Sequence, residues 1–126
     1  MADNLVIGWT LVLLGFVSGL FLGLHFHEDA WMGGYGSFPR RLIRLGHIAL
    51  VALGMVNVLF AVSVDGSALS DRWRQSASWL FITGGFAMPL CCILTARFPR
   101  ARACFVVPVI ALICAAAIMA IGSVVS

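Results

Sequence analysis

The chain has 126 residues, of which 62% are hydrophobic and 10% are charged, and its mean hydropathy is +1.06. Soluble domains are about 45–50% apolar and about 25% charged, so this composition excludes an ordinary water-soluble domain and indicates lipid as the solvent. All eight basic residues are arginine and the net charge is only +3. No basic run with interleaved aromatic residues is present, so nucleic acid is not an expected partner.

Four apolar stretches are each long enough to cross a bilayer core as a helix, which takes roughly 20 residues. They cover approximately Leu5–Leu24, Gly46–Val64, Ser76–Thr95 and Cys104–Val125. None of them alternates apolar and polar residues as the strands of a membrane barrel do. The sequence therefore predicts an all-α fold, an integral membrane four-helix bundle, as a single transmembrane domain over residues 1–126.

Arginine is divided unequally between the two sides of the predicted membrane. Six arginines lie in the first and third loops, and only Arg72 and Arg74 lie on the opposite side. Because Lys and Arg concentrate in cytoplasmic loops, we expect these two loops in the cytoplasm and both termini outside. The expected location is a bacterial-type cytoplasmic (inner) membrane, with lipid as the surrounding partner.

The two halves of the chain share a pattern. The order W-x5-G-F-x3-L-x3-L in Trp9–Leu24 recurs in Trp79–Leu94, and Phe38-Pro39-Arg40 recurs as Phe98-Pro99-Arg100. A duplication would make the fold two helical-hairpin repeats of the parallel type, related by an axis along the membrane normal. Chance similarity between two apolar sequences is the alternative.

Three glycines in the first stretch, Gly15, Gly19 and Gly23, are spaced i, i+4, i+8 and lie on one helix face. Small residues at this spacing let another helix approach closely. We expect this face to pack against a helix of the same subunit, of another membrane subunit or of a second copy in a homo-oligomer. A bare surface for a flat cofactor is the alternative.

The segment after the glycines holds most groups capable of chemistry. It contains all three histidines, two carboxylates and three arginines: His25, His27, His47, Glu28, Asp29, Arg40, Arg41 and Arg44. The histidines end the first predicted helix and begin the second, so they are expected at one membrane end. His25 and His27 would point to nearly opposite sides of a helix, whereas Arg40, Arg44 and His47 follow i, i+4, i+7 and share a face.

Three interpretations of this segment remain open. In the first, His47 with His25 or His27 ligates a b-type haem, with Arg40, Arg41 or Arg44 on its propionates. In the second, the histidines with Glu28 or Asp29 bind a transition metal such as Zn, Fe or Cu. In the third, no cofactor is bound and the histidines are interfacial polar residues.

Two further features lie within the apolar stretches. Asn57 is the one strongly polar side chain well inside a span; an interhelical hydrogen bond is expected of it, and a place in a substrate or quinone pocket is the alternative. Cys91, Cys92 and Cys104 lie towards the cytoplasmic end. They are expected to be small core residues, with soft-metal ligation as the alternative.

The arrangement of short-looped helices, with histidines and arginines at one membrane end, resembles small haem-binding or accessory membrane subunits of bacterial respiratory complexes. This resemblance implies a subunit of a larger electron-transfer complex. No nucleophile–base set or phosphate-binding loop is present, so we expect no catalytic activity of the chain alone. The alternatives are a small homo-oligomeric transporter or channel, a membrane enzyme with a metal at the histidines, and a purely structural subunit without cofactor.

Overall fold

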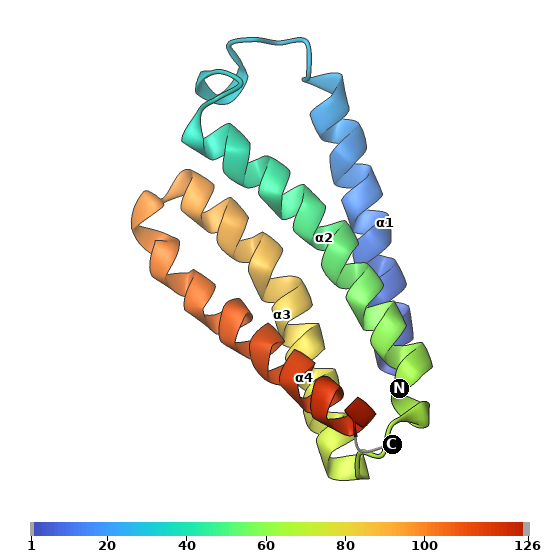
Figure 1. Cartoon of the computed structure of the whole chain (residues 1–126). Helices are drawn as coiled ribbons and strands as arrows, with labels where there is room; N and C mark the ends of the chain where they lie inside the picture. The colour runs from blue at the N-terminus through green and yellow to red at the C-terminus, as the bar shows by residue number, and fades with distance from the viewer. Residues whose placement is uncertain (1, 125–126) are drawn as a thin grey trace.

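The computed structural model describes residues 2–124, and the described part is all-helical without a strand. Its four long helices are α1 (Ala2–Leu24), α2 (Phe38–Ser63), α3 (Asp71–Arg97) and α4 (Val106–Val124) (Figure 1). Three short 3-10 helices connect them: η1 (Trp31–Gly33), η2 (Val64–Gly66) and η3 (Pro99–Phe105). All four long helices are long and apolar enough to cross a membrane, so the predicted fold class of a multi-pass helical membrane protein is confirmed.

The helices extend beyond the apolar stretches into polar sequence. The second helix begins at Phe38, not at Gly46, because Ser37 caps it: the Arg40 amide donates to the Ser37 hydroxyl at 3.3 Å, and a proline occupies the first turn. The third helix likewise begins at Asp71, not at Ser76. The predicted end of the fourth helix, Val125, lies outside the described residues.

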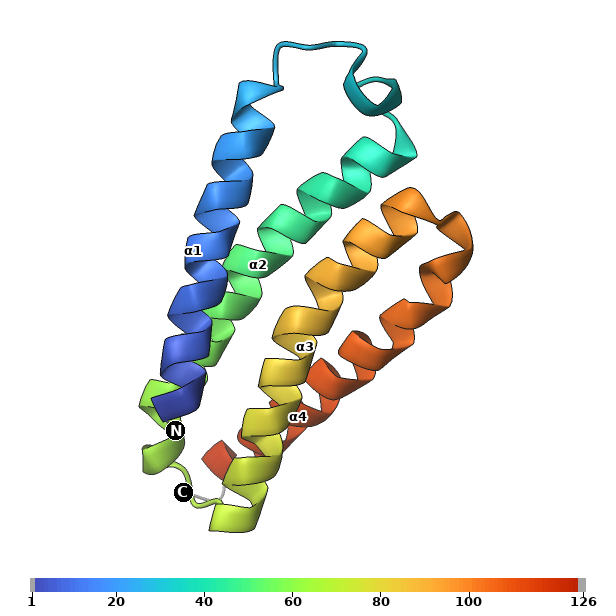
Figure 2. The same cartoon turned by 180° about the vertical axis from the view of Figure 1, so that it is seen from behind.

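Each helix packs mainly against its neighbours in the sequence, so that α1 and α4 flank the α2–α3 pair (Figures 1 and 2). The loops 25–37 and 98–105 lie at one end of the molecule, which we call the histidine end. Both chain termini and the loop 64–70 lie at the other, which we call the terminal end. Of the four spans, the third, which contains α3, has the largest share of buried residues, and the fourth, which contains α4, has the smallest. The outer helices thus offer apolar faces to lipid.

Small residues let α1 and α2 approach each other. A Cβ on Gly54 would lie 2.7 Å from the carbonyl oxygen of Gly8, and one on Gly19 would lie 2.7 Å from Cε1 of His47. Gly15 is buried against Val51. The expected close helix packing is therefore found at Gly15 and Gly19, within one chain, and the sequence reasoning missed Gly8 and Gly54. No atom outside its own helix turn lies within 4 Å of a Cβ on Gly23.

A hydrogen-bonded group joins α1, α2 and α3 near the terminal end. The side-chain amide of Asn4 donates to Oδ1 of Asn57 at 2.9 Å, and the hydroxyl of Ser78 donates to Oδ1 of Asn4. Asn57 itself donates to the carbonyls of Phe81 at 3.2 Å and Leu53 at 3.0 Å. Both asparagines are fully buried. The predicted interhelical hydrogen bonding of Asn57 is confirmed, while the part played by Asn4 was not foreseen.

An apolar cluster beside this group fastens α4 to the other helices. Phe60 and Phe81 meet with their ring centroids 5.2 Å apart, and Ala77 and Ala115 are completely buried beside them. The two alanines let the backbones of α3 and α4 come together, which suits helix packing in lipid. This buried apolar cluster therefore lies at the terminal end, away from the histidines.

Candidate functional site at the histidine end

The loop 25–37 is folded into a chain of tight turns. Backbone bonds run from the amides of Glu28, Trp31 and Gly34 to carbonyls three residues earlier, each at 3.2 Å. Met32 and the glycines at 33 and 34 have positive φ values of 53°, 84° and 102°, a region that glycine enters without steric cost. The hydroxyl of Ser37 closes the fold by donating to the Met32 carbonyl at 2.7 Å. The glycines at the start of the G-G-Y-G sequence thus allow the backbone to turn.

Arg40 is the centre of this loop. Its side chain comes from the first turn of α2, and the residue is only 3% exposed. Its guanidinium donates to five backbone carbonyls of the loop, those of Glu28 at 3.0 Å, Phe26 at 3.4 Å, and His25, Asp29 and Trp31 at 3.5 Å. A buried guanidinium is tolerated only when its donors are satisfied, and here carbonyl dipoles satisfy it without a carboxylate.

Two aromatic rings cover the same cation. The guanidinium carbon of Arg40 lies 5.4 Å from the ring centroid of Trp31 and 5.1 Å from that of Tyr35, within the range of cation–π attraction. The guanidinium carbon of Arg44 lies 4.3 Å from the ring centroid of Tyr35, and Arg44 also donates to the Tyr35 carbonyl at 3.3 Å. We call Arg40 together with the loop 25–37 the Arg40 cap.

The cap changes the expected use of the arginines. Arg40 and Arg44, which the sequence places beside His47 for a haem propionate, both donate hydrogen bonds to backbone carbonyls of the loop. Arg41 is exposed, and residues 2–124 offer its guanidinium no hydrogen bond. The carbonyls of Glu28 and Asp29 face Arg40, while both residues are exposed. Arg40 is thus the arginine bonded fully within the loop, whereas the Arg44 guanidinium donates to a single carbonyl and that of Arg41 to none in residues 2–124.

His47 is held in a recess on the glycine face of α1. Its Nδ1 lies 2.9 Å from the carbonyl oxygen of Gly15 and 3.1 Å from the hydroxyl of Ser18. A carbonyl only accepts, so Nδ1 carries the proton and Nε2 of the neutral ring is an acceptor. Within residues 2–124 nothing donates to Nε2. Gly19 leaves the space in which the ring lies.

The other two histidines lie elsewhere. His25 has its Nδ1 3.0 Å from the carbonyl of Phe21 and stacks on Trp31, with centroids 4.9 Å apart at 25°. His27 is exposed. In the described part of the chain, no group of three His, Cys, Asp or Glu side chains is placed to hold a metal ion. The described residues therefore form no three-ligand metal site from the histidines with Glu28 or Asp29, and the pairing of His47 with His25 or His27 about a haem stays a prediction.

Sequence reasoning missed Arg40 as the organiser of the loop. A usable signal was present: the first arginine after a Ser-Phe-Pro helix start follows a loop that contains a Trp, a Tyr and a glycine turn. Aromatic faces and free carbonyls are what a partly buried guanidinium needs. The pairing of Nδ1 of His47 with Gly15 was also unforeseen, although the i, i+4 glycines indicated the space.

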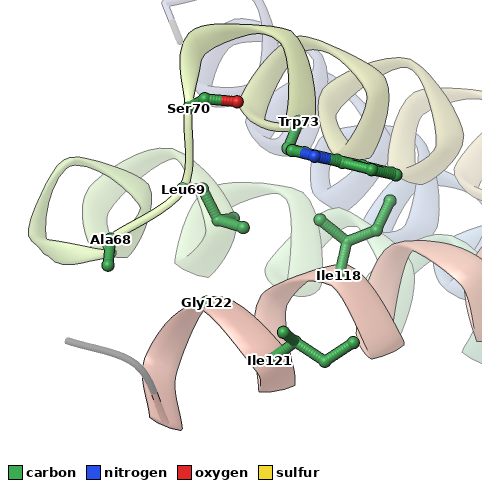
Figure 3. Close-up of a pocket in the computed structure, with 7 residues that line it drawn as sticks. All are labelled: Ala68, Leu69, Ser70, Trp73, Ile118, Ile121 and Gly122. Atoms are coloured by element: carbon green, nitrogen blue, oxygen red, sulfur yellow. The ribbon is translucent and has the colours of Figure 1, made fainter.

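Two of the hollows at the terminal end lie beside α3. One of about 450 Å³ is lined by side chains of the loop 64–70, α3 and α4, with Trp73 and Leu69 on one side and Ile118 and Ile121 on the other (Figure 3). The other, of about 480 Å³, lies between the starts of α1 and α3 and includes Asp3. The first is almost wholly apolar, as expected of a surface that lipid covers.

Comparison with protein-family models, curated proteins and solved structures finds no match to this chain.

Proposed function

We propose that this chain is a small multi-pass subunit of a larger membrane complex, of the electron-transfer kind, and that it docks to that complex through the Arg40 cap. The observation that carries the proposal is the burial of the Arg40 guanidinium among five loop carbonyls. That arrangement fixes the shape of a polar loop at the membrane boundary. A loop ordered before it binds loses less entropy on association.

The outer surface of the cap supports a docking role. His27, Glu28 and Asp29 of the cap, and Arg41 beside it on α2, are all exposed, and the described residues give their side chains no ion pair. Mixed positive and negative groups on a rigid loop favour specific recognition of a complementary protein surface. A loop that served only to connect α1 to α2 would not need a buried cation.

The transporter alternative is less well supported. It relied on Asn57 and the glycine face as the lining between copies of the chain. Asn57 is satisfied by Asn4 and by two carbonyls, and Gly15 and Gly19 are covered by α2. Polar groups that line a path normally face a cavity or a neighbouring subunit, whereas these face their own chain.

A second candidate function, contribution of one axial ligand to a b-type haem, is favoured by His47. A ligating histidine usually donates its second ring N–H to a carbonyl or carboxylate, which is the arrangement of Nδ1 with Gly15. Nε2 lies against α1, 3.3 Å from the position of a Cβ on Gly19, and a Cβ on Gly23, one turn further along, would meet no atom within 4 Å. Since His25 is stacked elsewhere, the second ligand would come from the partner subunit.

The test is purification of the tagged chain from its native membrane in a mild detergent. We expect it to migrate with larger polypeptides and to lose them in Arg40→Gln but not in the matched Gly23→Ala, which alters an open position outside the cap. An Arg41→Gln variant should weaken the association without unfolding the cap. A homogeneous oligomer of this chain alone would contradict the subunit proposal and favour the transporter.

The haem candidate has its own readout. A Soret band in the purified complex that is lost in His47→Ala and kept in His25→Ala would support it. A colourless complex that contains the larger polypeptides would remove the haem and leave the docking proposal in place. A Soret band unchanged by His47→Ala would assign the haem to the partner alone.

The proposed orientation places the histidine end in the cytoplasm. It is tested with a thiol reagent confined to the periplasm, in a background without the native cysteines. We expect labelling of Ser70→Cys and none of Asp29→Cys, because both positions are exposed and lie at opposite ends. The reverse pattern would overturn the orientation without affecting the fold.

A further inference from the structure

The turn between α3 and α4 carries three arginines that the chain leaves unpaired. Arg97, Arg100 and Arg102 are exposed, and within residues 2–124 their guanidinium groups make no hydrogen bond or ion pair. No acidic residue follows Asp71 in the sequence, so neither the rest of α3 nor α4 supplies a carboxylate for them. We call these three residues the η3 arginines.

The η3 arginines are confined to the membrane boundary. The third and fourth spans, Asp71–Arg97 and Pro99–Val124, are separated by Phe98 alone. A 3-10 helix rises about 2 Å per residue, so η3 covers roughly 14 Å, little more than the distance of about 8–10 Å between packed helix axes. Figure 1 shows the chain turning directly from α3 into α4, without the longer segment that joins α1 to α2. The guanidinium groups therefore lie at the depth of lipid headgroups.

The repeated Phe-Pro-Arg element shows what an arginine at this place requires. In the first element, the buried Arg40 donates to five carbonyls of the loop 25–37. In the second, Arg100 follows the same Phe-Pro start, but this turn has no long loop that folds back over the side chain. Unpaired polar groups are costly beside an apolar medium. The donors of Arg100 therefore need acceptors from outside the chain.

Exposed apolar side chains adjoin the arginines. Phe98 is exposed, with its ring centroid 5.3 Å from the guanidinium carbon of Arg97. Ile93 near the end of α3 and Val107 at the start of α4 are exposed as well. Positive groups above an apolar surface are complementary to a molecule with an anionic head and hydrocarbon chains. Arginine is suited to such a head because its planar guanidinium matches phosphate oxygens with two parallel hydrogen bonds.

We propose that the η3 arginines bind the phosphate groups of anionic phospholipids in the leaflet at the histidine end, with the acyl chains against Phe98, Ile93 and Val107. Arg100 and Arg102 are two residues apart in a helix of three residues per turn, so they point to different sides and bind different headgroups. The bound lipids hold the turn before α4 at the membrane boundary. The proposal is independent of the docking function, since it concerns the other loop of the histidine end.

Native mass spectrometry of the full-length chain in a non-ionic detergent tests this binding. The protein is titrated with phosphatidylglycerol or with phosphatidylcholine of the same acyl chains. We expect the affinity for phosphatidylglycerol to be higher by about tenfold or more, because several arginines contribute, and the difference to shrink as salt is added. Arg100→Gln should weaken phosphatidylglycerol binding about fivefold, the contribution of one basic side chain near an anionic membrane.

Arg72→Gln is the matched control, because Arg72 is an exposed arginine at the terminal end beside Asp71, and it should leave the preference unchanged. Glutamine at all three η3 arginines should abolish the preference, whereas lysine at all three should keep part of it, which separates lost charge from misfolding. Equal binding of the two lipids by the unaltered chain would overturn the proposal, as would equal effects of Arg72→Gln and Arg100→Gln. Competition by glycerol phosphate at the lipid's own concentration would also overturn it, assigning the arginines to a soluble phosphate.

Discussion

The two ends of the molecule bury polar groups in opposite ways. At the terminal end, Asn4, Asn57 and Ser78 are neutral side chains on three helices that satisfy one another. At the histidine end, the charged side chain of Arg40 is satisfied by the backbone of a single loop. The first arrangement holds helices to each other, whereas the second holds a loop in shape.

The difference follows from the surroundings of each group. Neutral amides can lie within an apolar helical bundle when their hydrogen bonds are complete, whereas a guanidinium is costly at depth and belongs at the membrane boundary. Turns at the end of α1 leave carbonyl oxygens free, and Arg40 uses them. Helix association and loop order are therefore separable in this molecule, and the following variants test that separation.

The largest effect is expected from Gly54→Leu. Its new side chain would meet the carbonyl of Gly8, a backbone atom that cannot turn aside, so α1 and α2 must separate. Overpacking costs about 1–3 kcal/mol or more, and Leu at this site lies at the upper end. Reversible unfolding in mixed micelles measures the loss. Gly23→Leu is the matched control at an open position, and equal losses in the two variants would contradict the assigned packing.

Arg40→Gln should have the next largest effect, confined to the histidine end. Hydrogen bonds from a charged donor contribute about 1.5–3 kcal/mol each when buried, but water at the boundary replaces part of this once the loop opens. We expect rapid proteolysis within 25–37 and little change in the unfolding of the helices. Arg41→Gln is the control, because the Arg41 side chain is exposed and makes no hydrogen bond to residues 2–124. Protection of the loop in Arg40→Gln would mean that it is ordered without the cation.

A smaller loss is expected from Asn57→Leu. It removes the bonds to Asn4 and Phe81, and interhelical hydrogen bonds in membranes contribute about 1 kcal/mol. Combining it with Asn4→Ala in a double-mutant cycle should give a positive coupling energy, measured by the same unfolding assay. The cap should stay resistant to protease. If the losses in the free energy of unfolding of the two variants simply add, the two asparagines do not act together.

The parts of this structure that follow local rules were predictable from the sequence. Apolar length identified the four helices, and i, i+4 spacing identified the close approach at Gly15 and Gly19. The isolation of Asn57 in an apolar stretch indicated a hydrogen bond between helices. In each case the residue pattern and the apolar surroundings were enough to predict the structural feature.

The candidate site was predicted less well because it lies where regular structure ends. The last residue of α1 is Leu24, and a shift of one residue turns a side chain by about 100°, so the direction of His25 could not be derived. The left-handed turn at Met32 and Gly33 sets which carbonyls reach Arg40. Helical periodicity placed Arg40, Arg44 and His47 on one face, but it gives no information about the loop that occupies that face.

We infer that Arg40 orders the loop before any partner binds, and hydrogen–deuterium exchange of the purified chain tests this order most directly. We predict slow exchange at the amides of Glu28, Trp31 and Gly34, which are bonded within the loop, and fast exchange there in Arg40→Gln with Arg41→Gln unchanged. Exchange of these amides in the unaltered chain at the rate of an unstructured peptide would contradict the account.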